Sequence, residues 1–96
     1  DYPLTSYPAG DQDWAAWQYD RPDLREGLVQ VFRRAASPFV SALFRLRALD
    51  PEATYRVTSL DGGESQELTG RELAEDGFPV TLARRPDSGV WTYRRV

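Results

Sequence analysis

The sequence of 96 residues contains no cysteine, no histidine and no lysine. Without cysteine the chain can form no disulfide, no thiolate nucleophile and no cysteine-ligated zinc site. Without histidine it lacks the usual general base at neutral pH and the central residue of a Ser-His-Asp triad. The absence of lysine excludes Schiff-base chemistry and a phosphate-loop lysine. An enzyme built from this chain alone is therefore not expected.

Long apolar runs and excess positive charge are also missing. No apolar run approaches the roughly 20 residues that span a bilayer, so we expect no membrane-spanning segment. The net charge is −3 and the isoelectric point is about 4.8, whereas nucleic-acid-binding domains are usually basic. We expect neither a membrane nor a nucleic acid as partner. The lack of cysteine is compatible with a cytoplasmic location, which we take as the expectation.

What the chain does contain is typical of a small globular domain, with 41% hydrophobic and 28% charged residues. Short β-prone segments are separated by turn residues at intervals of roughly 8–12 residues, as in antiparallel sandwiches. The sequence predicts an all-β fold, a small antiparallel β-sandwich of about seven strands with one short helical turn. The expected strands cover 14–19, 28–34, 40–47, 54–58, 64–68, 78–82 and 90–94.

Alternation of apolar and polar residues predicts which side chains are buried. The segment 28–34 is mostly apolar and is predicted to be a central strand covered on both faces. The segment 40–47 has the clearest period of two, which places alternate residues on one face. The residues expected on its buried face are Val40, Ala42, Phe44 and Leu46.

The helical turn is specified by its ends. Thr69 and Glu72 fit a capping box, in which each side chain accepts a hydrogen bond from the other residue's backbone N–H. Leu68 and Leu73 stand at the positions of a hydrophobic staple, and Gly77 is a natural stop. The sequence thus predicts one short helix between the fifth and sixth expected strands.

The first residues differ in character from the rest. Pro3 and Pro8 favour extended backbone and cannot donate a hydrogen bond to a sheet. We interpret residues 1–13 as an extended arm that leads into an antiparallel β-sandwich domain of residues 14–96. A chain that begins at Asp1 without methionine is also expected to be part of a longer polypeptide.

The fifteen carboxylates cluster mainly in expected turns and at the helix end, where acidic residues usually cap or face solvent. The dense spots are Asp11 with Asp13, Asp20 with Asp23, and Glu75 with Asp76. The turn at 61–64 offers oxygen ligands for calcium but matches no complete calcium loop, so a plain β-turn is the expectation. We expect no catalytic residue, no metal site and no cofactor in this chain.

Aromatic residues provide the candidate binding positions. Two pairs share a strand face, and exposed aromatic rings can bind the apolar faces of sugars. Alternatively the rings fill the core, because a chain this short needs large core residues. The candidate carbohydrate-binding residues are Trp17, Tyr19, Trp91 and Tyr93. The arginines on expected strands are interpreted as solvated or partner-facing, and they are Arg33, Arg34, Arg45, Arg47, Arg94 and Arg95.

The order of several segments resembles glycoside hydrolase family 36, the α-galactosidases. The start of the chain is similar to the family's DYYPLTPY stretch, and 14–22 to its W-x-A-W-Q-F-D-R-P motif. The segments 31–38, 46–57 and 70–80 resemble AFRR…SP, L-R-G-L-D-P-x-A-x-Y-x-V and G-x-E-L…G-x-x-V, respectively. The resemblance covers nearly the whole chain, with Tyr19 where the family commonly has Phe.

This resemblance implies that residues 1–13 are a linker arm from a catalytic barrel not included in this sequence. Residues 14–96 are then the C-terminal antiparallel β-sandwich domain that follows the barrel. Family members hydrolyse terminal α-D-galactosides, such as melibiose and raffinose, with retention of configuration. Both catalytic aspartates belong to the barrel, so the resemblance assigns no catalytic residue to this chain. It implies a non-catalytic accessory domain that packs on the barrel within the same polypeptide. The alternative function is a carbohydrate-binding module with an oligosaccharide as partner.

Overall fold

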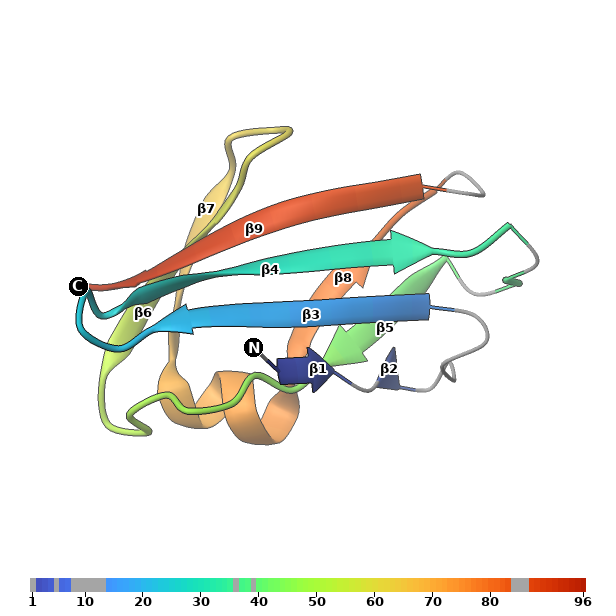
Figure 1. Ribbon diagram of the computed structural model, residues 1–96. Helices are drawn as coiled ribbons and strands as arrows, with labels where there is room; N and C mark the ends of the chain where they lie inside the picture. The colour runs from blue at the N-terminus through green and yellow to red at the C-terminus, as the bar shows by residue number, and fades with distance from the viewer. Residues whose placement is uncertain (1, 5, 8–13, 36, 39, 84–86) are drawn as a thin grey trace.

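The computed structural model describes the chain except for residues 1, 5, 8–13, 36, 39 and 84–86. The described part is an antiparallel sandwich of two sheets and one short helix, as the sequence predicts (Figure 1). The six-stranded sheet has the order β1-β3-β4-β9-β6-β7, and the three-stranded sheet has the order β2-β5-β8. The elements are β1 (Tyr2–Leu4), β2 (Ser6–Tyr7), β3 (Trp14–Arg21), β4 (Glu26–Arg33), β5 (Ser41–Phe44), β6 (Thr54–Ser59), β7 (Ser65–Thr69), the π-helical turn η1 (Glu72–Asp76), β8 (Phe78–Thr81) and β9 (Asp87–Arg95).

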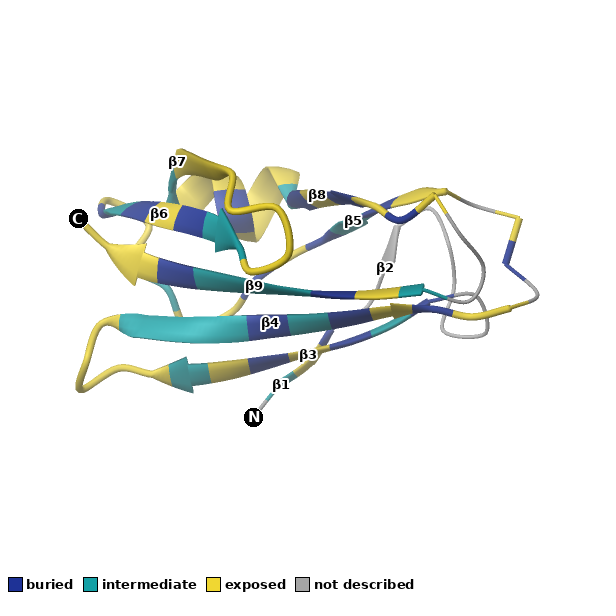
Figure 2. Cartoon of the chain, turned by 90° about the horizontal axis from the view of Figure 1, so that it is seen from above, coloured by how far each residue is buried: buried dark blue, intermediate teal, exposed yellow. Residues whose placement is uncertain are grey.

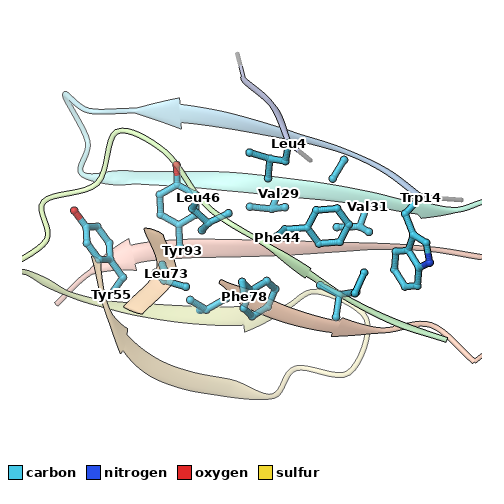
Figure 3. Packing of buried hydrophobic residues seen from close by; sticks show 14 of the residues in the cluster. Leu4, Trp14, Val29, Val31, Phe44, Leu46, Tyr55, Leu73, Phe78 and Tyr93 are labelled. Atoms are coloured by element: carbon cyan, nitrogen blue, oxygen red, sulfur yellow. The ribbon is translucent and has the colours of Figure 1, made fainter. Parts of the chain in front are cut away.

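The core lies between the two sheets, and its side chains come from both of them (Figure 3). Phe44 of β5 is fully buried, and its ring centroid lies 6.0 Å from that of Trp14 of β3. Leu73 of η1 closes the same cluster beneath the sheets. Buried residues alternate with more exposed ones along β3 (Figure 2), so this strand has one inward and one outward face. The buried residues of β9 are Gly89 and Tyr93, which lie on the same face of that strand.

Two of the burial predictions are wrong in part. Val40 is 50% exposed because it lies in a bend before β5 and does not continue the alternation of that strand. Ala42, Phe44 and Leu46 are buried as predicted. Strand β4 is central in its sheet, between β3 and β9, but only one of its faces is covered. In this two-layer sandwich the small sheet packs on one face of the large sheet, and the opposite face, which carries Phe32, is open to solvent.

Parts of the expected linker arm are strands of this sandwich. β1 pairs with β3, placing Leu4 opposite Ala16, and the Leu4 side chain is part of the core. β2 pairs with β5 in the other sheet. The backbone is extended there, as Pro3 suggested, and it is also paired. The remainder of the expected arm, residues 8–13, lies outside the described residues.

The short helix begins with the predicted capping box. The Thr69 N–H donates to Oε1 of Glu72 at 2.9 Å, and the Glu72 N–H donates to Oγ1 of Thr69 at 3.1 Å. Helical backbone starts at Gly70 and continues through η1. The turn ends at Gly77, whose φ of 94° favours glycine and whose N–H donates to the Glu72 carbonyl. This helix places Leu73 under the sandwich, where the Leu73 carbonyl accepts the N–H of Leu46.

Ala48, two residues after Leu46, has a strained backbone conformation. Ala48 has a φ of 65°, in the left-handed region that costs an L-residue roughly 1–2 kcal/mol, and the resembled L-R-G-L-D-P motif has glycine at this position. We expect Ala48→Gly to raise the free energy of unfolding by about 0.5–1 kcal/mol, since glycine's greater freedom in the unfolded chain offsets part of the relief. Urea unfolding measures the change. Ala74→Gly, at an exposed position of η1, is the control and should destabilise; a loss for both variants would contradict the prediction.

Candidate functional site

A buried polar network occupies the inner face of β3 and β9. The Gln18 side chain is fully buried, and its Nε2 donates to the Tyr93 hydroxyl at 2.9 Å and to the Arg47 carbonyl at 2.8 Å. Its Oε1 accepts the Arg47 N–H at 2.8 Å. The Tyr93 hydroxyl in turn donates to Oδ1 of Asp20 at 2.6 Å. The network joins β3, β9 and the backbone at Arg47, and it involves Gln18 and Asp20 of the WQYD stretch.

Tyr93 therefore cannot provide a sugar platform. Its side chain is 1% exposed, and its ring packs edge-on against Tyr55 at 6.1 Å between the sheets (Figure 3). Of the two alternatives for this ring, a sugar platform or a core position, the structure shows the core position, because Trp91 and Tyr93 share the inward face of β9. Gly27 of β4 pairs with Tyr93 of β9 and leaves room for the phenol. A Cβ at residue 27 would overlap the Tyr93 hydroxyl.

The network predicts an alkaline stability effect. Burial and the hydrogen bond to Asp20 hold the pKa of Tyr93 above the usual 10.0. The unfolded chain releases this proton near pH 10 and the folded chain does not, so the stability from the protonated phenol is complete below pH 10 and is lost as the pH rises above it. We expect this group to lower the free energy of unfolding by about 1.4 kcal/mol per pH unit above pH 10.

Urea unfolding between about pH 9 and 11 measures this slope. Tyr93→Phe should remove the part of the slope that comes from Tyr93, although it also loses stability at neutral pH. Tyr19→Phe is the matched control, since the Tyr19 side chain is exposed on the other face of the sheet. Equal slopes for the native chain and Tyr93→Phe would show that Tyr93 is not protected in the folded state.

The outer face of the six-stranded sheet carries exposed aromatic residues. Trp17 and Tyr19 of β3 are 38% and 39% exposed, and Phe32 of β4 is 37% exposed. The rings of Trp17 and Phe32 meet edge-on at 6.1 Å. The half-buried side chains of Leu28 and Val90 lie on the same face by register. We call these residues, Trp17, Tyr19, Leu28, Phe32 and Val90, the outer aromatic face.

A depression of about 600 Å³ adjoins Trp17 and Phe32 at one end of this face. Arg34 and Ser88 contribute to its lining. Arg33 also contributes, but its side chain is 3% exposed and donates to the carbonyls of Leu82 at 2.6 Å and Ser37 at 3.1 Å. The expectation of a solvated or partner-facing Arg33 was wrong, because the alternation of β4 turns residue 33 inward with Val29 and Val31.

The other two tryptophans have different environments. Trp14 is buried in the core against Phe44. Trp91 is half-buried, and its ring meets that of Phe78 edge-on at 5.7 Å. Trp91 also lines a groove of about 780 Å³ between β8 and the β6–β7 hairpin. The four candidate sugar-binding residues are thus divided between the outer aromatic face, the groove and the core.

Several of the carboxylate groups are engaged in structural contacts. Asp20 accepts the Tyr93 hydroxyl, and Asp23 forms an ion pair with Arg21 at 3.0 Å in the β3–β4 turn. The hydrogen bond from Arg21 lowers the pKa of this exposed Asp23 carboxyl. Glu75 pairs with Arg71 at 3.6 Å. Asp11 and Asp13 lie outside the described residues.

Across the described residues, acidic side chains do not gather into a group of three or more that could hold a metal ion. In the same part of the chain, no helix has the length and apolar character needed to cross a membrane.

This architecture defines a β-sandwich module with a covered inner core and an aromatic outer face. The glycosyl hydrolase family 36 C-terminal domain model matches residues 14–92, and the chain belongs to this family. No curated protein sequence matches the chain.

Two solved structures share the fold. The galactosidase domain of the α-galactosidase-sucrose kinase AgaSK is similar over 88% of this chain, with 23% identity and a TM-score of 0.70. The α-galactosidase from Lactobacillus brevis is similar over 92%, with 16% identity and a TM-score of 0.71. The chain spans only 11% and 12% of the lengths of these two proteins.

Proposed function

We propose that this chain is a non-catalytic accessory domain of a longer α-galactosidase-type hydrolase. Its role is to pack on the catalytic barrel of the same polypeptide and hold it in shape. The proposal is carried by the family match over residues 14–92, together with the small share of each solved galactosidase that the chain spans. The parent enzyme would cleave terminal α-D-galactosides with retention of configuration, as the family resemblance implies.

The outer aromatic face is the surface proposed for this packing. Sheet faces exposed to water normally carry polar residues, whereas this one places Trp17, Tyr19 and Phe32 in solvent. A contiguous exposed apolar patch commonly marks an interface. The occupant is the remainder of the polypeptide, since the solved galactosidases that share this fold are much longer than the chain. A rigid support matters because a displacement of about 1 Å in catalytic groups can cost roughly a hundredfold in rate.

An assay with nitrophenyl α-galactoside tests whether catalysis depends on the part of the polypeptide outside this chain. The complete product of the gene that encodes this chain is compared with the 96-residue chain alone. We expect turnover by the complete product and none above a buffer blank by the chain alone. Turnover by the chain alone, or a complete product without α-galactosidase activity, would overturn the proposal.

Substitutions on the outer aromatic face test the docking surface. In the complete product, Trp17→Ser combined with Phe32→Ser should lower the temperature at which activity is lost, by about 2–4 °C for each kcal/mol of lost packing. The same pair in the 96-residue chain measures what the substitutions cost within the domain. Leu24→Ser, at an exposed apolar residue in the β3–β4 turn, is the control. A shift in the complete product that corresponds to no more lost free energy than the pair costs in the chain alone would exclude this face as the docking surface.

Carbohydrate binding is the second candidate for the same face. Trp17 and Tyr19 are exposed side by side on β3, so their rings are accessible to a sugar. The two functions compete for one surface. Saturable binding of galactosides by the 96-residue chain, lost in Trp17→Ala, would favour the binding module over barrel support.

A further inference from the structure

The groove between the sheets is distinct from the outer aromatic face. Its lining residues come from β8, from β9 and from the β6–β7 hairpin. Its volume of about 780 Å³ falls within the range of about 300–1,000 Å³ found for small-molecule sites. Its lining combines aromatic, acidic and amide side chains, among them Trp91, Phe78, Asp61, Glu64, Gln66 and Asp87.

Trp91 is held in a defined position in this groove. Its ring meets Phe78 edge-on at 5.7 Å, with 74° between the ring planes. On the other side it lies over Gly89, where a Cβ would stand 2.7 Å from Cη2 of Trp91. Glycine at 89 therefore allows the indole to lie along the strand. An aromatic ring fixed in this way loses little freedom when a ligand packs on it.

A carboxylate stands beside the same ring. The point over Gly89 that lies 2.7 Å from the indole lies 3.6 Å from Oδ2 of Asp61. Asp61 and Glu64 belong to the exposed tip of the β6–β7 hairpin, so their side chains are accessible from solvent. Carboxylates accept strong hydrogen bonds from hydroxyl groups. A ring with an acceptor at its edge suits a ligand that has an apolar face and hydroxyls around its rim.

We infer that this groove is a saccharide subsite, with Trp91 under the sugar ring and Asp61 and Glu64 accepting its hydroxyls. The lining carries the carboxylates of Asp61, Glu64 and Asp87, and none of the described residues that line it is basic, so an anionic ligand is disfavoured. The choice of a galactoside rests on the proposed function, since the substrate class of the parent enzyme determines which sugar reaches the domain. The site would hold part of an oligosaccharide away from the catalytic barrel.

Titration of the 96-residue chain with melibiose, followed by NMR of the three indole N–H signals, tests this inference. Single Trp→Phe variants assign the signals. We expect the Trp91 signal to shift saturably and the Trp17 signal to stay in place. Asp61→Asn and Glu64→Gln lie on an exposed hairpin, so both variants should fold. Each should weaken binding by about tenfold, because the neutral amide oxygen accepts a weaker hydrogen bond than the charged carboxylate does.

Glu67→Gln is the matched control, since it changes an exposed carboxylate of β7 that pairs with Arg56 and does not line the groove. It should leave the affinity unchanged. Absence of saturation, equal weakening by Glu67→Gln, or a shift confined to the Trp17 signal would each overturn the inference. Binding of arginine amide in place of melibiose would do so as well, because it would identify a cation site. None of these outcomes affects the α-galactosidase assay, so the proposed function is tested separately.

Discussion

Replacing Phe44 with alanine is expected to lower the free energy of unfolding by about 3–5 kcal/mol. Phe44 is fully buried, contacts the Trp14 ring across the sandwich, and pairs with Phe78 of β8. Both sheets meet at this side chain, so neither can move in to fill the cavity without losing its own pairing. Folded domains have only about 5–15 kcal/mol of total stability, so the loss is large for a 96-residue chain.

Urea unfolding followed by tryptophan fluorescence measures the effect. Phe44→Leu retains most of the volume and should cost less than about 1.5 kcal/mol, which keeps the test informative if the alanine variant does not fold. Phe32→Ala removes the same side chain from the outer aromatic face. It should cost about 1 kcal/mol, mainly the edge-on contact with Trp17. Similar losses of stability for Phe44→Ala and Phe32→Ala would contradict the assignment of Phe44 to the core and of Phe32 to the exposed face.

The second large effect is expected at Gln18. Gln18→Met keeps the size of the side chain but removes every hydrogen bond that it makes. The Arg47 N–H, the Arg47 carbonyl and the Tyr93 hydroxyl would each lose their bond to Gln18. A buried polar group without a partner costs about 1–3 kcal/mol, so we expect a total loss of about 3 kcal/mol, since Tyr93 still donates to Asp20.

Hydrogen exchange separates this mechanism from a packing effect. In the native chain the Arg47 amide is bonded to Oε1 of Gln18, and it should lose protection in Gln18→Met even under folding conditions. Gln30→Met, on the outward face of β4, is the matched control and should change stability by less than about 0.5 kcal/mol. Retained protection at Arg47, together with a loss of stability, would contradict the proposed role of the network.

Features that depend on residues close together in the sequence could be predicted, whereas most of those that depend on distant residues could not. Local signals were sufficient for the capping box of Thr69 and Glu72, since both partners lie within one helical turn and each bond depends only on nearby backbone. They were also sufficient for the inward Ala42 and Phe44, where strict alternation continues through β5. Alternation failed at Val40 because a bend precedes β5, and no residue type there marks the bend clearly.

The buried network shows what sequence reasoning missed. On β3 the inward positions read Trp14, Ala16 and Gln18, so a glutamine stands where an apolar residue is expected. That break in the pattern was a usable signal for a buried hydrogen bond. Its partners were not predictable, since Arg47 and Tyr93 are 29 and 75 residues away from Gln18. The same holds for one acceptor of Arg33, since Leu82 is 49 residues away, although the other acceptor, Ser37, is only four residues away.

The amino-acid sequence by itself determined the class of fold, the approximate positions of most strands, the helix cap and the family resemblance. These follow from short-range periodicity, turn chemistry and the order of motifs along the chain. The tertiary structure alone decided which sheet face stays uncovered, and so which aromatics are available: Trp17 and Tyr19 face solvent, Trp91 lines the groove and Tyr93 is buried. The reason is that exposure depends on which face the opposite sheet packs against, and that packing is set by residues far apart in the sequence.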